Sequence, residues 1–201
     1  MTDLFLEVFP HYTANQADEL FQHYRSSYRA RAHHETRIYP GVAEAMAMLG
    51  GRKGTATGKG TATARAVLEM FDLLQHFDHV QGTDGFPGKP EPDVILKALQ
   101  ALGARPEECL MVGDSLVDMQ AARRAGVRTC AVRYGYGVPE QLMGFGPDFW
   151  VDDLRELAGI EKTEPARHGF STVLPLLESS NPIKTNQINV DEIGKTTPKI
   201  I

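Results

Sequence analysis

The stretch Cys109-Leu110-Met111-Val112-Gly113-Asp114-Ser115-Leu116-Val117-Asp118 decides the fold of this 201-residue chain. An apolar run is followed by Gly113 and then by two aspartates, Asp114 and Asp118, which are four positions apart. Residues 119–126 then have a helical composition and end in Gly126, a residue type that commonly stops a helix. The stretch therefore predicts a buried strand, a tight turn and a helix.

The two aspartates of this stretch have two interpretations. In an open parallel sheet, ligands bind at the carboxyl ends of the strands, where the turn after Val112 is expected to lie. Asp114 and Asp118 would then suit a hard divalent cation such as Mg²⁺. In the structural interpretation, Asp114 only caps the helix and Asp118 is a solvated acid of the first turn.

The composition indicates an ordinary globular protein of one domain, with room for a small appendage. A net charge of −5 gives no reason to expect nucleic acid or an anionic membrane as a partner. We find no secretory segment and no long apolar span. Cys109 and Cys130 lie in strand-like runs and are expected to be reduced core residues. A cytoplasmic protein is therefore expected; the oligomeric state is not indicated.

The rest of the chain alternates between strand and helix patterns, which predicts an α/β fold with a parallel sheet. Helices are expected after Thr13, over about 42–49, and through Leu157 at the end of the pattern. Two more are expected after the glycine-rich stretch 50–61, with an apolar face from Ala64 to Phe71, and after residues 89–93, ending at Gly103. Further strands are expected within 50–61 and over 77–81, 128–134 and 149–151. From about Glu161 the pattern becomes polar and aperiodic, apart from one short apolar helix expected around 173–177.

Two loops could bind an anion. Thr57-Gly58-Lys59 opens a helix, where backbone amides and a hydroxyl can hold phosphate, although a flexible glycine loop is the alternative. Lys89 stands between Gly88 and Pro90, so its backbone is restrained. A lysine fixed in this way near two carboxylates could neutralise a phosphate, and the alternative is a solvated surface lysine.

These motifs stand in one order on one α/β pattern: Thr57-Gly58-Lys59, then Lys89-Pro90-Glu91-Pro92-Asp93, then Val112-Gly113-Asp114-Ser115 with Asp118. In this the chain resembles the haloacid dehalogenase (HAD) superfamily of phosphohydrolases over roughly residues 1–160. Within it, the chain is most similar to phosphoglycolate phosphatases, through Tyr39-Pro40-Gly41-Val42, Phe77-Asp78, Gly82, Lys89-Pro90 and Tyr134-Gly135-Tyr136-Gly137.

The resemblance implies a role for each motif residue. Thr57 and the amide of Gly58 would bind the substrate phosphate, and Lys89 would stabilise that phosphate and the aspartyl intermediate. Asp114 would ligate Mg²⁺, with Asp118 at the same metal site. A phosphoryl group needs such cations to approach a carboxylate nucleophile.

The resemblance also implies an HAD-like Rossmannoid parallel sheet. Residues 1–40 would be part of a helical cap and residues 41–160 the α/β core. Residues 161–201 have no counterpart in the family, and their polar, aperiodic sequence predicts a mostly disordered tail.

One departure concerns the nucleophile. Such enzymes open with a strand ending in Asp-x-Asp-Gly-Thr, and this chain contains no Asp-x-Asp. Thr83-Asp84-Gly85 matches this motif only in part, because it has one carboxylate. It also lies between the Thr57 and Lys89 motifs, where it cannot replace the first strand. The chain is therefore expected to begin after the first strand. Loss of that strand would expose pairing edges in the sheet.

Two functions remain open. The first is Mg²⁺-dependent hydrolysis of a small phosphorylated metabolite such as 2-phosphoglycolate, by a truncated chain whose activity is in question. The second is a non-catalytic module that binds phosphate or a protein. A dehalogenase would need the same missing nucleophile and explains Asp114 less well.

Overall fold

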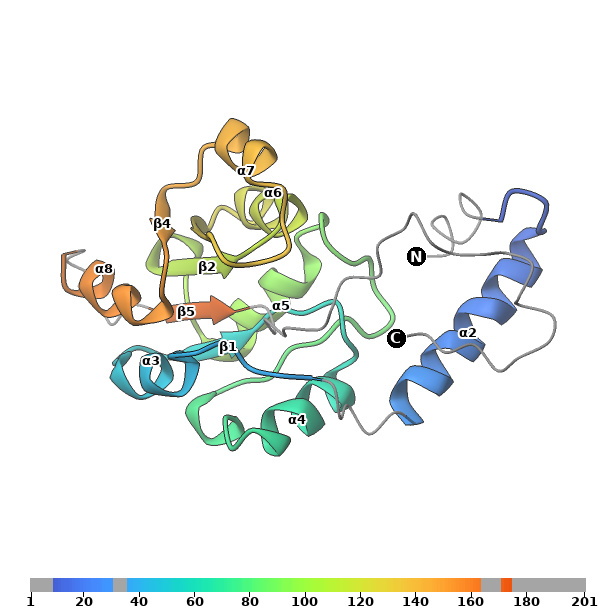
Figure 1. The fold of residues 1–201 in the computed structure, drawn as a ribbon, viewed down its shortest axis with the longest axis horizontal. Helices are drawn as coiled ribbons and strands as arrows, with labels where there is room; N and C mark the ends of the chain where they lie inside the picture. Colours follow the sequence, from blue (N-terminus) through green and yellow to red (C-terminus); the bar gives the residue numbers. More distant parts are fainter. Residues whose placement is uncertain (1–8, 31–35, 164–170, 175–201) are drawn as a thin grey trace. The chain divides into compact units, whose positions relative to one another are not determined.

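The computed structural model describes residues 9–30, 36–163 and 171–174 of the chain (Figure 1). It divides into two compact units, Met1–Glu35 and Thr36–Ile201. The first unit contains the helix α2 (Ala14–Ala30), which begins after Thr13 as predicted. Thr13 and Gln16 cap it reciprocally, because each backbone N–H donates to the other's side chain. None of the described helices is both long and apolar enough to cross a membrane.

A five-stranded parallel sheet forms the second unit, which confirms the predicted α/β fold. Its strand order is β1-β5-β2-β3-β4. The strands are β1 (Lys53–Thr55), β2 (Cys109–Gly113), β3 (Arg128–Val132), β4 (Phe149–Val151) and β5 (Ser171–Leu174). The helices are α3 (Val42–Met48), α4 (Thr61–Met70), α5 (Asp93–Leu102), α6 (Leu116–Arg124), α7 (Pro139–Phe145) and α8 (Leu157–Thr163), with 3-10 turns at Leu74–His76, Pro106–Glu108 and Leu154–Glu156.

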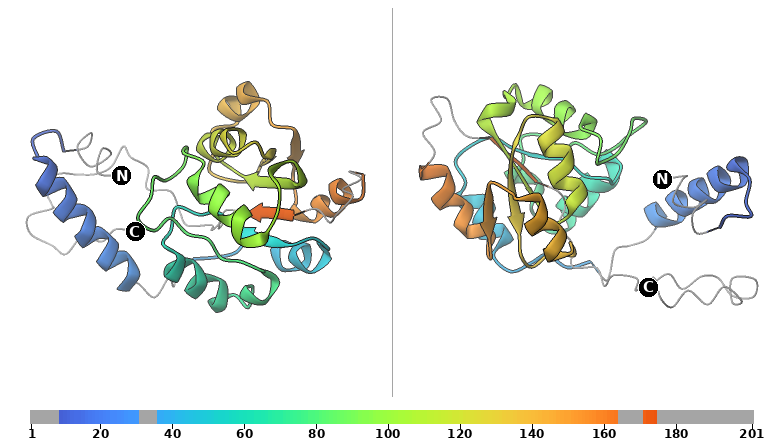
Figure 2. Two further views of the ribbon diagram at one scale, coloured as in Figure 1. Left: turned by 180° about the vertical axis from the view of Figure 1, so that it is seen from behind. Right: turned by 90° about the horizontal axis from the view of Figure 1, so that it is seen from above.

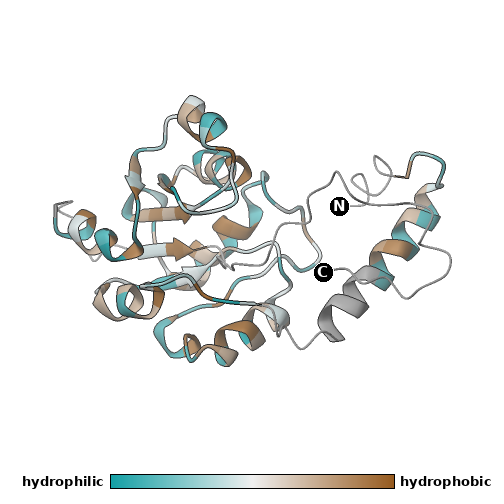
Figure 3. Ribbon diagram, viewed as in Figure 1, coloured by the Kyte–Doolittle hydropathy of each residue, from teal (hydrophilic) through white to brown (hydrophobic). Residues whose placement is uncertain are grey.

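Both faces of the sheet are covered (Figure 2). The ribbon of β2 is largely apolar (Figure 3), as expected for a strand that is buried on both faces. On one face, Cys109 and Met111 of β2 pack with buried residues of α5 and α6. On the other, Leu110 and Val112 pack with residues of α3 and α8. The alternation follows from the period of two residues along a strand. It accounts for the continuous apolar run that predicted a buried strand.

The segment 77–81 is not a strand of the sheet. It lies beside β1 with isolated bridges only, Gly54 with His79 and Thr57 with Gly82. Its contacts with β1 include the Thr55 N–H to His79 O bond and the bond from the Thr55 hydroxyl to Gln81 O. The hydrogen bonds expected for a strand are thus partly made, but not as a continuous ladder.

The largest difference from the sequence-based expectation concerns the carboxyl-terminal part. Residues 171–174, expected in a polar tail or a short helix, form β5 at the centre of the sheet, and all four are buried. Val173 pairs with Gly54 of β1 and with Met111 of β2. The expectation of open pairing edges is therefore wrong for these two strands. The core also extends beyond the expected boundary at residue 160, since α8 runs to Thr163. Residues 175–201 lie outside the described part.

Candidate active site

The candidate site lies at the carboxyl ends of β1 and β2, which both pair with β5. Thr57 follows β1 and Asp114 follows β2 directly. Parallel strands bring these ends to one edge of the sheet, the edge at which open α/β sheets bind ligands. The fold thus places the first and third sequence motifs at a common edge.

Lys89 joins the three motifs. Its ammonium donates to Asp118 Oδ1 at 2.5 Å and to the carbonyl of Ala56 at 2.9 Å. The side chains of Lys89 and Asp118 are only 10% and 4% exposed. Since Ala56 immediately precedes Thr57, one buried cation connects the phosphate-loop candidate with helix α6. The solvated interpretations of Lys89 and of Asp118 are therefore wrong.

Ser115, which the sequence analysis did not single out, caps α6 in place of Asp114. Its hydroxyl and its N–H both donate to Asp118 Oδ2, at 2.5 and 3.1 Å, and its Oγ accepts from the Asp118 N–H. This is a capping box, for which the Ser-x-x-acid spacing is the sequence signal. Both oxygens of Asp118 are thereby engaged, one by Lys89 and one by Ser115.

Asp114 is held differently. Its Oδ2 accepts the backbone N–H of Tyr136 at 2.8 Å. Among the described residues, Tyr136 is the one other than Asp114 itself that donates a hydrogen bond to this carboxylate. Burial raises the pKa of Asp114, while the Tyr136 N–H and the charge of Lys89 act in the opposite direction. Asp114 therefore has an oxygen available to a ligand, whereas Asp118 does not in this arrangement.

The loop after β1 leaves space for an anion. Thr57 is buried, and its hydroxyl accepts the Lys59 N–H at 3.2 Å. Gly58 is exposed, and a Cβ there would meet nothing within 4 Å. In the described part of the chain, the Gly58 N–H has no acceptor. Backbone amides of an exposed loop that leads into a helix can bind a phosphate oxygen.

Residues 82–84 hold this loop, and sequence reasoning missed their role. The Thr83 hydroxyl donates to the Thr57 carbonyl at 2.9 Å, and Asp84 Oδ2 accepts the Thr61 N–H at 3.0 Å. A Cβ on Gly82 would lie 2.3 Å from the Thr61 nitrogen, so only glycine fits there. Asp84 is thus bound to the first turn of α4, where a carboxylate stabilises the helix dipole.

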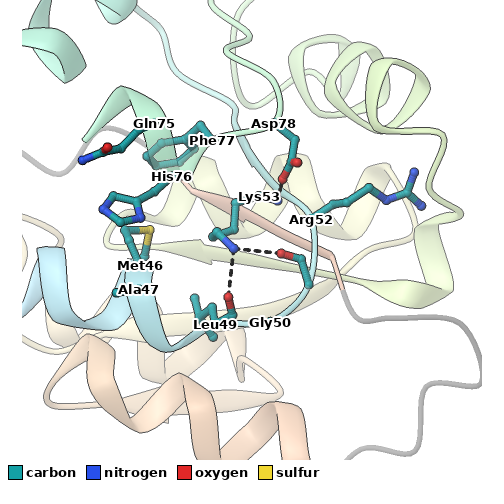
Figure 4. Close-up of a pocket in the computed structure, with 11 residues that line it drawn as sticks. Met46, Ala47, Leu49, Gly50, Arg52, Lys53, Gln75, His76, Phe77 and Asp78 are labelled. Atoms are coloured by element: carbon teal, nitrogen blue, oxygen red, sulfur yellow. Dashed lines mark hydrogen bonds between the residues drawn. The ribbon is translucent and has the colours of Figure 1, made fainter. Parts of the chain in front are cut away.

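A separate cavity of about 470 Å³ lies at the amino end of β1 (Figure 4). Its lining includes Arg52, Lys53, His76 and Asp78. The Lys53 ammonium donates to the carbonyls of Leu49 and Gly51, both at 2.9 Å, and Arg52 donates to the last carbonyls of α5. These cations stabilise the local backbone. Because the cavity is at the opposite end of β1 from Thr57, it is not part of the candidate site.

Comparison with known proteins identifies one family of hydrolases. The family model described as haloacid dehalogenase-like hydrolase matches residues 2–132. A phosphoglycolate phosphatase of Pseudomonas putida is 32% identical over 132 residues, which are 64% of this chain and 48% of that protein. A pyrophosphatase PpaX of Bacillus cereus is 43% identical over 72 residues, 36% of this chain and 33% of that protein.

Solved structures agree with the sequence matches. A haloacid dehalogenase-like hydrolase from Streptococcus pneumoniae has a TM-score of 0.68 at 26% identity, covering 78% of this chain and 75% of that one. A structure titled a predicted phosphatase, from Clostridium acetobutylicum, has a TM-score of 0.72 at 26% identity, covering 81% and 77%. The chain thus aligns with about half of the phosphoglycolate phosphatase and a third of the pyrophosphatase.

Proposed function

The chain belongs to the haloacid dehalogenase-like hydrolases, and from this premise we propose that it binds a small phosphorylated metabolite with Mg²⁺ for phosphomonoester hydrolysis of the phosphoglycolate phosphatase type. The observation that carries the proposal is the position of Lys89. It contacts the carbonyl before Thr57 and the carboxylate of Asp118. A cation held there lies between the loop that would take the phosphate and the strand end that carries Asp114.

Each residue then has a role. The amide of Gly58 and the hydroxyl of Thr57 bind phosphate oxygens, and Lys89 balances their charge. Asp118 keeps Lys89 in place, and Ser115 keeps Asp118 in place. Direct ligation of the metal by Asp118 stays a prediction, because it requires the release of one of these bonds.

Asp114 is the residue that would hold Mg²⁺. No cluster of three or more His, Cys, Asp or Glu side chains occurs among the described residues. A single carboxylate nevertheless fits Mg²⁺, which keeps several waters and binds through one or two carboxylates and substrate phosphates. When bound, the ion supplies charge to polarise the phosphoryl oxygens.

Asp114→Asn is expected to weaken Mg²⁺ binding by about tenfold or more, because it replaces a charged oxygen ligand with a neutral amide. Titration calorimetry with MgCl₂ measures the affinity. Asp152→Asn is the matched control, since Asp152 also follows a strand of the sheet but is 75% exposed and pairs with Arg133. Equal affinities for the parent chain and Asp114→Asn would contradict the metal role.

A second candidate function is phosphate binding without hydrolysis. Two observations favour it: the chain contains no Asp-x-Asp, and β5, at the centre of the sheet, has the sequence Ser171-Thr172-Val173-Leu174 without a carboxylate. An aspartyl-phosphate intermediate requires a carboxylate nucleophile at the phosphate.

The two functions are separated by one experiment. The purified chain is assayed with 2-phosphoglycolate and with an aryl phosphate in the presence of Mg²⁺, beside Asp114→Asn, while ³¹P NMR follows binding of inorganic phosphate. Hydrolysis that is lost in Asp114→Asn supports the first function. Binding without hydrolysis supports the second, and neither binding nor hydrolysis would refute both.

A further inference from the structure

The loop that follows β3, Tyr134-Gly135-Tyr136-Gly137, packs directly on Asp114. The Tyr136 N–H donates to Asp114 Oδ2 at 2.8 Å. A Cβ on Gly135 would lie 2.1 Å from the Asp114 Cβ, and a Cβ on Gly137 would lie 1.8 Å from the Asp114 carbonyl oxygen. The loop therefore contacts Asp114 at both its side chain and its main chain.

The two glycines are required by this contact. Neither Gly135 nor Gly137 is among the residues with positive φ, so their backbone conformation is open to other residues. What excludes a side chain at both positions is the closeness of Asp114. A loop that only turned the chain would need no such approach, so this one is built around the carboxylate.

Tyr39, from a distant part of the sequence, packs against the same loop. The rings of Tyr39 and Tyr134 have centroids 4.8 Å apart. Burial is the main reason why the pKa of Tyr39 is raised to about 12. The loop is therefore supported on one side by an aromatic contact.

We propose that Tyr134–Gly137 is the positioning loop of Asp114: the Tyr136 N–H fixes one carboxylate oxygen so that the other is presented to the cation, and the ring of Tyr39 supports the loop through its contact with Tyr134. The link to the cation rests on the proposed function. A ligand whose orientation is fixed by an outer hydrogen bond binds metal more tightly than a free one, and such partners change metal affinity by about 10- to 100-fold.

The first test does not depend on metal. Amide hydrogen exchange at Tyr136 is measured by NMR in the parent chain, in Asp114→Ala and in Asp152→Ala. Loss of a hydrogen bond to a charged group should speed exchange about 10- to 100-fold in Asp114→Ala. Asp152→Ala should match the parent chain. Equal exchange rates in all three proteins would overturn the assignment of the loop.

The second test measures what the loop does for the cation. Mg²⁺ affinity is compared by calorimetry in Gly135→Ala and Gly144→Ala, with thermal unfolding recorded for both. Gly144 lies in α7, where an added Cβ would meet nothing within 4 Å, so it is the matched control. Gly135→Ala should bind Mg²⁺ at least about tenfold more weakly, while Gly144→Ala is unchanged. Equal affinities in a folded Gly135→Ala would refute a positioning role.

The third test examines the support that Tyr39 gives to the loop. Tyr39→Ala removes the ring that contacts Tyr134, and Tyr39→Phe keeps the ring as the matched control. Tyr39→Ala should speed exchange of the Tyr136 amide severalfold, whereas Tyr39→Phe should match the parent chain. Equal exchange in Tyr39→Ala and the parent chain would overturn the role of Tyr39. A parent chain that binds no Mg²⁺ would refute the proposed function, whereas the exchange rates would still decide the role of the loop.

Discussion

Lys89→Met is expected to weaken phosphate binding strongly and to destabilise the second unit. A charge-assisted hydrogen bond contributes about 1.5–3 kcal/mol, so its loss should weaken binding of inorganic phosphate by about 10- to 100-fold. Asp118 would be left as a buried carboxylate without its cation, and removing one partner of a buried pair costs about 3–5 kcal/mol. Phosphate or vanadate titration measures the first effect, and urea unfolding measures the second.

A double variant separates these two effects. Lys89→Met with Asp118→Asn removes both charges while the amide can still accept from Ser115. Since a buried pair can often be replaced by neutral groups at little cost, this protein should recover most of the lost stability. It should not recover phosphate binding. A stable double variant that binds phosphate as the parent does would show that Lys89 is only structural.

The site was predictable where the relevant signal is local. The apolar run before Gly113 and the Ser115-x-x-Asp118 spacing determine a strand, a turn and a capped helix by short-range chemistry alone. The approach of Gly135 to Asp114 and the bond from Tyr136 are contacts between separate turns. The glycines of residues 134–137 mark a loop in the sequence, but no local pattern shows that this loop approaches Asp114.

The central strand β5 could not be predicted for a different reason. Ser171–Leu174 is buried on both faces, so it shows no alternation of apolar and polar residues. It is also short and begins with two hydroxyl residues in a polar region. Its place is determined by backbone N–H and C=O groups of β1 and β2, with which β5 pairs. Both of these strands lie more than fifty residues before β5 in the sequence.

Introducing a carboxylate pair after β5 is expected to create phosphatase activity. Val173 packs on the face of the sheet covered by α5 and α6, the helix that carries Asp118. Pro175 and Leu177 follow in the sequence, and changing both to aspartate gives the Asp-x-Asp spacing that the chain lacks. Pro175→Asp with Leu177→Asp should therefore raise Mg²⁺-dependent hydrolysis of an aryl phosphate at least about a thousandfold over the parent chain, because a nucleophile and a general acid are both supplied.

Three controls make this gain specific to the site. Leu176→Asp adds one carboxylate without the Asp-x-Asp spacing and should stay at the parent level. Asp114→Asn or Lys89→Met, added to the double variant, should remove the new activity, which excludes a contaminating phosphatase. A double variant that folds and binds phosphate but hydrolyses nothing would show that β5 does not occupy the position of the nucleophile strand. The reason for a gain is geometric: β5 ends between the strand that leads to Thr57 and the strand that leads to Asp114. A nucleophile introduced after Leu174 is therefore expected to act on a phosphate held at the proposed site of Gly58 and Lys89.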